Sequence, residues 1–194
     1  MGDVGLVVVA YLLGSLPTAY LITKAVTGRD IRRLGSGNVG GLNAGRNAGV
    51  LTGVLTALVD AGKGYLAAAL AQRFGHWAWL PLAAALAVIV GHNWMLFLGF
   101  RGGGKGLGAG AGAFLRLNPW VLLMVVALFG LAGLVSRDFY IGVVGAVLFL
   151  PLILGLFYPS AAAPIYLGAA MAVAIVAKHV PNIRAYVAGK RELL

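Results

Sequence analysis

The densest group of polar residues in this sequence lies in residues 27–47, TGRDIRRLGSGNVGGLNAGRN, which contain six Gly, four Arg and three Asn. Glycines let backbone N–H groups approach a ligand closely, and charged or amide donors beside them suit an anion such as phosphate. The donors of this stretch with that potential are Ser36, Asn38, Asn43 and Arg46. The alternative is a solvated, flexible glycine loop without a ligand.

The same stretch formally contains a dinucleotide-binding fingerprint. Gly35, Gly37 and Gly40 have the spacing G-x-G-x-x-G, and Asp60 follows twenty residues after the last glycine. That fingerprint works only after a strand and within a βαβ unit, and no such unit is compatible with the long apolar runs around it. We therefore reject a dinucleotide site.

A second glycine-rich stretch, GHNWMLFLGFRGGGKGLGAGAG, covers residues 91–112. It matches the Walker A pattern as far as Lys105, but Gly106 stands where that loop needs Ser or Thr to hold Mg²⁺. Consecutive glycine N–H groups that lead into a helix still form an anion cradle, to which Lys105 adds a full charge. We expect this cradle at residues 99–106. His92 is a candidate substrate contact, although a lone His in a span more often packs or hydrogen-bonds.

A third cluster, KHVPNIR, covers residues 178–184, where an apolar run ends and Pro181 is expected to break the helix. His179 and Asn182 are three residues apart and would face the same way on a helical end. The sequence has no Cys, no H-E-x-x-H and no carboxylate cluster beyond the lone Asp60. We therefore expect no metal and no cofactor, and a site that orients phosphates and stabilises developing charge.

Long apolar runs separate these clusters, so membrane helices must position them. Of the 194 residues, 61% are hydrophobic and 10% are charged, far outside the range of a soluble domain. Runs close to the length that crosses a bilayer cover 6–25, 50–71, 79–98, 120–135, 141–157 and 162–177. The stretch 104–117 is shorter and is expected to be a half-helix. We predict an all-α polytopic membrane helix bundle, with about seven transmembrane or half-membrane helices and a single domain over residues 1–194.

The basic residues set the predicted orientation, with the N-terminus outside and the C-terminus in the cytoplasm. Only Arg73 and Arg116 then lie outside, and the inner segments hold Lys24, Arg29, Arg32, Arg33, Arg46, Arg101, Lys105, Arg137, Lys178, Arg184, Lys190 and Arg191. All three clusters would meet on this inner face. The net charge of +10 sits in short loops, so we expect no nucleic-acid partner. Lys63 lies within a span, three residues after Asp60, and has either an ion-pairing or a site role.

In order and spacing, the motifs GSGNVGGLNAGR, DAGKG, GHNWMLFLGFRGGGKG and HVPNI resemble those of the bacterial acyl-phosphate:glycerol-3-phosphate acyltransferase family, PlsY. The resemblance implies that a fatty acyl group moves from acyl phosphate to glycerol 3-phosphate, forming lysophosphatidic acid and inorganic phosphate in phospholipid synthesis. It also implies a multi-pass protein of the bacterial inner (plasma) membrane whose active site faces the cytoplasm. The expected partners are these two substrates and membrane lipids, and the expected state is a monomer.

The motif match also implies roles for individual residues. The positions that match catalytic residues are Ser36, Arg46, Lys105, His179 and Asn182. The positions that match substrate-binding residues are Asn38, Gly40, Asn43, Gly103, Gly104 and Gly106, to which we add His92. The resemblance implies that a substrate phosphate, and no protein base, accepts the hydroxyl proton.

Several positions depart from the family pattern, among them Leu42, Tyr140 and Ala185, which stand where Thr, Ser and Arg are usual. These departures support, as an alternative, the same scaffold with a different phosphorylated acceptor. A further alternative, from another class, is a transporter or binding protein for an anionic lipid precursor.

Overall fold

A computed structural model describes residues 2–190 of the protein, so Arg191 lies outside the described residues. Within that range every regular element is a helix. Six helical segments are long and apolar enough to cross a membrane, namely Asp3–Thr27, Val50–Phe74, Leu80–Leu98, Pro119–Ser136, Phe139–Phe157 and Ala163–Val187. A shorter apolar helix, Leu107–Leu117, makes seven. The predicted all-helical polytopic architecture is confirmed.

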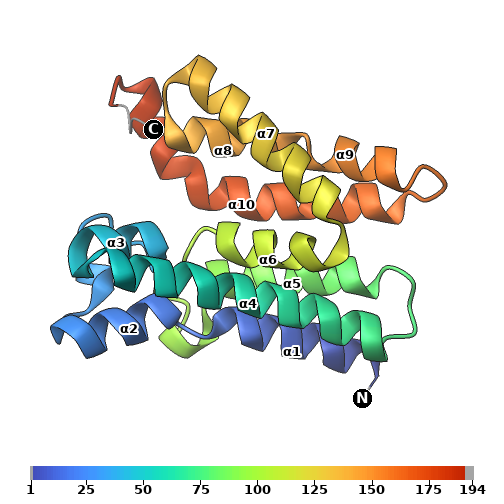
Figure 1. Ribbon diagram of the computed structural model, residues 1–194, viewed down its shortest axis with the longest axis horizontal. Coiled ribbons are helices and arrows are strands. Elements are labelled where there is room, and N and C mark those ends of the chain that lie inside the picture. The colour runs from blue at the N-terminus through green and yellow to red at the C-terminus, as the bar shows by residue number, and fades with distance from the viewer. Residues whose placement is uncertain (1, 191–194) are drawn as a thin grey trace. The chain divides into compact units, whose positions relative to one another are not determined.

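The chain divides between Leu117 and Asn118 into two compact units. The first unit contains α1 (Asp3–Ser15), α2 (Thr18–Thr27), the 3-10 helix η1 (Ile31–Arg33), α3 (Gly41–Ala48), α4 (Val50–Phe74), α5 (Leu80–Asn93), the 3-10 helix η2 (Leu96–Leu98) and α6 (Leu107–Leu117). Helix α4 packs against α1, α5 and α6. Within this unit, α2 and α3 lie at the end opposite the α4–α5 connection (Figure 1).

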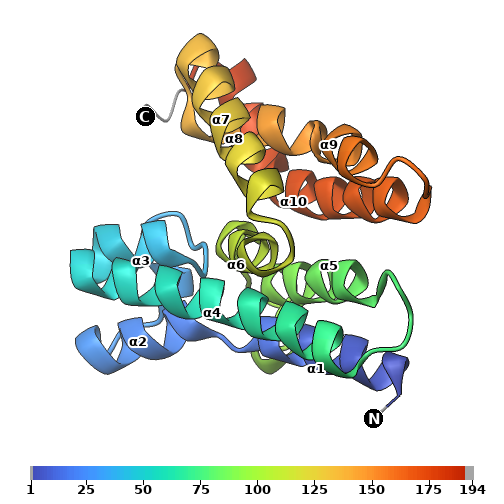
Figure 2. The same cartoon turned by 45° about the vertical axis from the view of Figure 1, so that its right-hand side comes forward.

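Small residues allow α4 and α6 to approach closely. Gly64 of α4 lies against the backbone of Ala109, and Gly112 of α6 lies against the backbone of Ala61, so a Cβ on either glycine would collide with backbone atoms. Close contact between small residues is a common way to pack helices in a membrane. As a result α6, which begins at Leu107 after the loop that carries Lys105, packs directly against α4 (Figure 2).

The first apolar run is not one continuous helix. It was expected as a span over 6–25, and the structure interrupts it at Leu16, whose backbone is extended (φ −60°, ψ 120°). Pro17 causes this break, because a residue before proline is pushed out of the helical region. The Leu16 carbonyl accepts hydrogen bonds from Thr18 N at 3.0 Å and from Lys63 Nζ at 2.7 Å, so the polar group at the break is satisfied within the protein.

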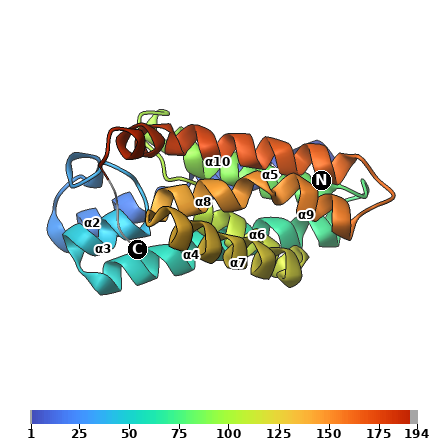
Figure 3. The same ribbon diagram turned by 90° about the horizontal axis from the view of Figure 1, so that it is seen from above.

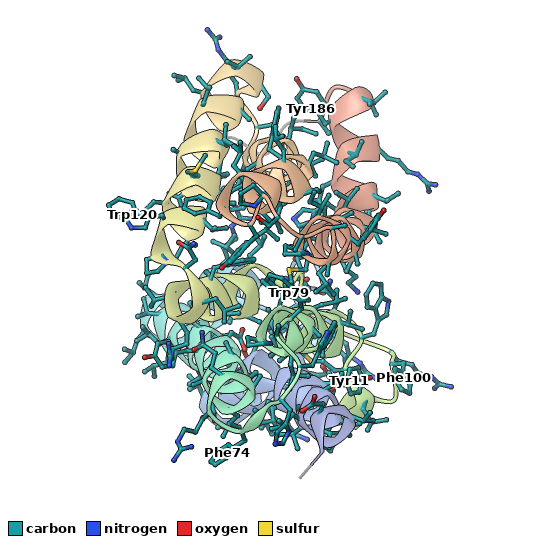
Figure 4. The ribbon with its side chains drawn as sticks, turned by 90° about the vertical axis from the view of Figure 1, so that its right-hand side faces the viewer. Tyr11, Phe74, Trp79, Phe100, Trp120 and Tyr186 are labelled. Carbon is teal, nitrogen blue, oxygen red and sulfur yellow. The ribbon has the colours of Figure 1, made fainter. Side chains whose placement is uncertain are left out.

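The second unit contains α7 (Pro119–Ser136), α8 (Phe139–Leu148), α9 (Leu150–Phe157) and α10 (Ala163–Val187). Helices α8 and α9 follow one another alongside α10 (Figure 3). The expected span 141–157 is therefore two helices, with Pro151 in the first turn of the second. Trp120 of α7 is exposed and points away from the other helices of this unit (Figure 4), as expected for a residue that faces lipid.

Two local predictions are wrong. Helix α10 continues through Pro181 to Val187, so this proline does not end the helix; it only removes one N–H donor from the interior. The stretch 27–47 is not entirely loop, because residues Gly41–Ala48 form α3. In addition, the half-helix expected from residue 104 begins at Leu107.

Candidate active site

Asn43 of α3 holds the first glycine loop, residues 34–40, in shape. Its buried Nδ2 donates to Leu34 O and to Asn38 O, both at 3.0 Å. Its Oδ1 accepts from Ser36 N at 3.2 Å and from Asn47 Nδ2 at 3.0 Å. Since both ends of the amide bind the loop and its own helix, these contacts support a positioning role for Asn43.

Gly35 and Gly37 make the turn that presents Ser36. Their φ angles are +51° and +71°, in the left-handed region that glycine adopts most readily. Gly37 N donates to Leu34 O at 2.9 Å and closes the turn. Ser36 is exposed at its tip, and its Oγ accepts from the half-buried Asn38 N at 3.4 Å. The predicted serine is therefore accessible on a backbone of defined shape.

The second glycine loop, residues 102–106, is tied by its backbone to the end of α5. Gly104 N donates to His92 O at 2.9 Å, and Met95 N donates to Gly102 O at 3.4 Å. Tyr11 of α1 adds a third link to this region, since its hydroxyl donates to Trp94 O at 2.9 Å (Figure 4 labels Tyr11). The loop is thus tied to the end of α5 and to Met95, and α1 contacts the neighbouring Trp94.

The predicted glycines of loop 102–106 are buried and closely packed. A Cβ on Gly103 would collide with the backbone of Asn93, and a Cβ on Gly104 would collide with the ring of His92. Gly106 has a φ of +79°, which an L residue rarely adopts. Glycine at these positions therefore reflects lack of space or a backbone conformation that other residues rarely adopt.

A backbone hydrogen bond joins the two glycine loops. Val39 N donates to Gly103 O at 3.0 Å, and Arg32 Cδ lies beside Gly102. Buried apolar residues that share one core cluster support this junction: Ala19, Ile31, Val39, Ala44 and Met95. The structure thus brings the first two predicted clusters together within the first unit.

The charged residues of these clusters come from helix ends. Lys105 is half buried and directly precedes Gly106 and the first turn of α6, where unpaired helix N–H groups favour an anion. Arg46 is exposed on α3, one helical turn after Asn43. Gly40 is the N-cap residue of the same helix. The first unit therefore offers an ammonium, a guanidinium and a hydroxyl near two glycine loops.

A basic and aromatic group lies beside the loops. Arg32 Nη2 pairs with Asp30 Oδ2 at 2.6 Å, and the guanidinium lies over the Tyr20 ring, 5.4 Å from its centroid. The hydrogen bonds from Arg32 lower the pKa of Asp30 below its ordinary value of 3.8 and outweigh the opposite effect of partial burial. Asp30 and Tyr20 thus hold the Arg32 guanidinium in place, and Lys24 Nζ in turn donates to Tyr20 Oη at 3.1 Å.

Lys63 and Asp60 form a buried ion pair. Lys63 Nζ lies 2.7 Å from Asp60 Oδ1, and both side chains are 5% exposed. The ion-pairing role considered for Lys63 is therefore present. His92 Nδ1 lies 3.7 Å from the same carboxylate oxygen. Among residues 2–190, no group of three or more His, Asp or Glu side chains is arranged to hold a metal ion.

The third cluster lies on α10, in the second unit. His179 is buried, and its Nδ1–H donates to Ile175 O at 2.8 Å, which defines the tautomer of the neutral ring. The Tyr140 ring lies 5.8 Å from the imidazole, centroid to centroid. Asn182 follows one turn later on the same continuous helix and is half buried. His179 and Asn182 therefore lie on one continuous helix, as the expectation that they face the same way requires. That they come close to the glycine loops stays a prediction.

Fold and loops together define an integral membrane helical protein with two glycine-rich loops joined by a backbone hydrogen bond. A family described as glycerol-3-phosphate acyltransferase matches residues 4–189. Glycerol-3-phosphate acyltransferase 2 of Moorella thermoacetica is 41% identical over 151 residues, which is 78% of this chain and 77% of that protein. The glycerol-3-phosphate acyltransferase of Synechococcus sp. (strain CC9902) is 35% identical over 184 residues, which is 95% of this chain and 91% of that protein.

Solved structures give the same result. The crystal structure of PlsY, an integral membrane glycerol 3-phosphate acyltransferase, in its glycerol 3-phosphate form has a TM-score of 0.86 and 30% sequence identity, covering 99% of this chain and 95% of that chain. The form described for lysophosphatidic acid has a TM-score of 0.83 and 29% identity. The chain belongs to the glycerol-3-phosphate acyltransferase family, as its motifs predicted.

Proposed function

We propose that this protein transfers a fatty acyl group from acyl phosphate to glycerol 3-phosphate, forming lysophosphatidic acid and inorganic phosphate. The observation that carries the proposal is the hydrogen bond between Val39 N and Gly103 O, which joins two anion-binding loops in one unit. Both substrates carry a phosphate, so two adjacent loops suit the pair. The family match extends over both units, and we take residues 1–194 as one acyltransferase domain.

Loop 102–106 suits the phosphate of the acyl donor. Its glycines are closely packed, and Lys105 adds a positive charge directly before α6, whose first turn of backbone N–H groups favours an anion. The predicted binding roles of Gly103, Gly104 and Gly106 are part of this proposal. The apolar segment Leu80–Leu98 ends before the loop, and the apolar helix Leu107–Leu117 begins after it. An acyl chain attached to this phosphate would therefore enter an apolar environment.

The first loop and α3 suit glycerol 3-phosphate. Arg46 lies on the surface of α3, and its guanidinium suits a bidentate contact with the phosphate of glycerol 3-phosphate. Ser36 and Asn38 offer hydrogen-bond donors from the turn formed by Gly35 and Gly37. Gly40 lets the chain pass close to the ligand, and Asn43 keeps the turn in place. From the motif match we assign His179 and Asn182 of α10 to the same reaction as further substrate contacts.

The reaction is a transfer between two bound phosphates. The acceptor hydroxyl attacks the acyl carbonyl carbon, a new C–O ester bond forms, and the C–O bond to phosphate breaks with its electrons on the leaving phosphate. The hydroxyl proton moves to a substrate phosphate, so the products balance without a protein base. Cationic groups held in place stabilise the charge that develops on the carbonyl oxygen and on the leaving group. Holding the acceptor hydroxyl in line with the acyl carbonyl carbon supplies much of the remaining rate enhancement.

The proposal includes a location. The excess of basic residues around the glycine loops supports a cytoplasmic site in the inner (plasma) membrane of a bacterium, with the N-terminus outside. Membrane lipids surround the bundle, and we propose a monomer as the working state.

A purified protein in detergent or lipid mesophase tests the activity. Phosphate should be released from acyl phosphate only when glycerol 3-phosphate is present, and mass spectrometry should detect lysophosphatidic acid in equal amount. No release under these conditions contradicts the proposal. Uptake of an anionic lipid precursor into proteoliposomes without turnover would support a transporter in its place.

A different phosphorylated acceptor is the second candidate. Tyr140 stands where a site serine is usual, and its ring packs 5.8 Å from His179, centroid to centroid. Leu42 is exposed on α3 beside Asn43. Leu42 lacks the hydroxyl of the usual Thr, and Tyr140 carries its hydroxyl on a large ring in place of the short side chain of the usual Ser. A panel of phosphorylated alcohols, compared by kcat/KM, should rank glycerol 3-phosphate first; another acceptor in that place would select the second candidate.

A further inference from the structure

A buried polar cluster, formed by Asp60, Lys63 and His92, lies inside the first unit. Their side chains are 5%, 5% and 4% exposed. Lys63 Nζ donates to Asp60 Oδ1 and to Leu16 O, both at 2.7 Å, and His92 Nδ1 lies 3.7 Å from the same Asp60 oxygen. The cluster therefore links α4 to α5 and to the break between α1 and α2.

Helix packing alone does not account for these charges. Burying an ion pair within membrane helices costs desolvation free energy, and well-packed apolar residues of similar volume often serve stability as well or better. Helix α4 also packs against α6 through small residues next to Asp60, since a Cβ on Gly108 would lie 3.1 Å from Asp60 Cβ. The cluster thus sits at the crossing that carries α6, the helix that follows loop 102–106.

The imidazole of His92 occupies the space beside Gly104. If Gly104 had a Cβ, its three nearest neighbours would all be atoms of the His92 ring, with Nε2 the nearest. The ring has one edge toward Asp60 and the other toward the loop, and His92 O accepts from Gly104 N at 2.9 Å. Any turn of the ring would therefore change the space into which Gly104 packs.

We propose that Asp60 and Lys63 hold the His92 ring against Gly104, and that this contact sets the position of loop 102–106 for the phosphate of the donor. All three are positioning residues and do not touch the substrate. This replaces the substrate-contact role predicted for His92. The proposal rests on the proposed function only for the identity of the bound phosphate ester, since the packing of the loop can be measured without turnover.

Hydrogen–deuterium exchange of the purified full-length protein tests the positioning directly. The double variant Asp60→Leu/Lys63→Met removes both charges together, which avoids an unpaired buried charge and should keep the bundle folded. We expect amide exchange in residues 102–106 to become at least about tenfold faster, with helices α4 and α5 still protected. Unchanged exchange in the loop of a folded double variant would overturn the proposal, whether or not the protein has acyltransferase activity.

A steric rescue tests the contact itself. Gly104→Ala should lower inorganic phosphate binding, measured by calorimetry, by about tenfold or more, because the new methyl group collides with the ring. Gly104→Ala/His92→Gly removes the ring and should recover at least part of that loss. A double variant that binds phosphate no better than Gly104→Ala alone would contradict the contact.

Kinetics then separate positioning from a general structural defect. For His92→Gln we expect the KM for acyl phosphate to rise about tenfold while the KM for glycerol 3-phosphate changes less than about twofold. His76→Gln is the matched control, since His76 is exposed in the connection between α4 and α5 and should leave both values unchanged. Equal changes in both KM values for His92→Gln would point to general loss of structure and against the proposal.

Discussion

The glycine loops and the His179–Asn182 pair are built in different ways. The two glycine loops, 34–40 and 102–106, come from distant parts of the chain. Their shape depends on the hydrogen bond from Val39 N to Gly103 O and on the side chains that pack against them. His179 and Asn182 lie on one continuous helix, and their spacing follows from a single turn of α10. A substitution that disturbs the tertiary contacts of the loops should therefore lower stability and activity together, whereas a substitution on the turn of α10 can lower activity alone.

The largest expected effect is that of Lys105→Ala, because it removes a full charge from the loop. We expect kcat/KM to fall by about a hundredfold or more, and the melting temperature to change little, since Lys105 is half exposed. Lys24→Ala is the matched control, since Lys24 is an exposed lysine of the same unit outside the loops. Near-normal turnover of Lys105→Ala would refute its role, and Arg46→Ala is expected to behave in the same way.

Gly103→Ala should combine both losses and so test the tertiary origin of the loops. The methyl group would collide with the Asn93 backbone, and we expect a fall in turnover of about tenfold or more together with about 1–3 kcal/mol of unfolding free energy. Gly62→Ala is its control: a Cβ there meets nothing within 4 Å, and helix α4 should gain up to about 1 kcal/mol. A Gly103→Ala protein with full stability and low turnover would contradict the expected difference between the loops and α10.

Asn182→Ala should affect activity without affecting stability. We expect a loss in kcat/KM of about tenfold and a change in unfolding free energy below about 1 kcal/mol, because Ala favours the helix more than Asn. Arg184→Ala, exposed on the next part of α10, serves as the control. A parallel fall in melting temperature for Asn182→Ala would show that this helix end is not locally determined.

Asp30→Asn should give the smallest effect, visible only as a pH dependence of stability. The folded-state pKa of Asp30 lies below 3.8, so the carboxylate stabilises the folded state above 3.8, and this contribution is lost as the pH falls through the lowered value. The pair is partly exposed, which limits the effect to about 1 kcal/mol or less. Unfolding curves of wild type and variant should differ near neutral pH and converge under acid conditions.

Much of the architecture could be predicted from residue types. Each expected apolar run has a matching helical segment, because hydropathy over a bilayer length is an additive, local property. The wrong predictions concern short segments in which the local sequence favours one structure and packing favours another. Gly41–Ala48 resembles a loop in composition yet forms α3, where Asn43 and Ala44 are buried. Pro181 stays within α10, since one missing N–H does not outweigh the rest of a 25-residue helix.

The family could be predicted from the motif order, but the arrangement of the candidate site could not. The roles of Ser36, Arg46 and Lys105 stay predictions, and the structure adds that Asn43 bonds the first glycine loop. Asp60 and Lys63 were visible as a pair three residues apart, a spacing that brings them onto one helix face. Nothing in that spacing pointed to Leu16 or His92.

By itself the sequence determined the membrane class, the helical spans and the family of this protein, because those depend on composition and on motifs read along the chain. Only the tertiary structure decided that Val39 bonds to Gly103, that Gly104 has no room for a side chain, and that Lys63 reaches the broken first span. These contacts join segments far apart in sequence. Their distances depend on how the helices pack, which no local pattern of residues records.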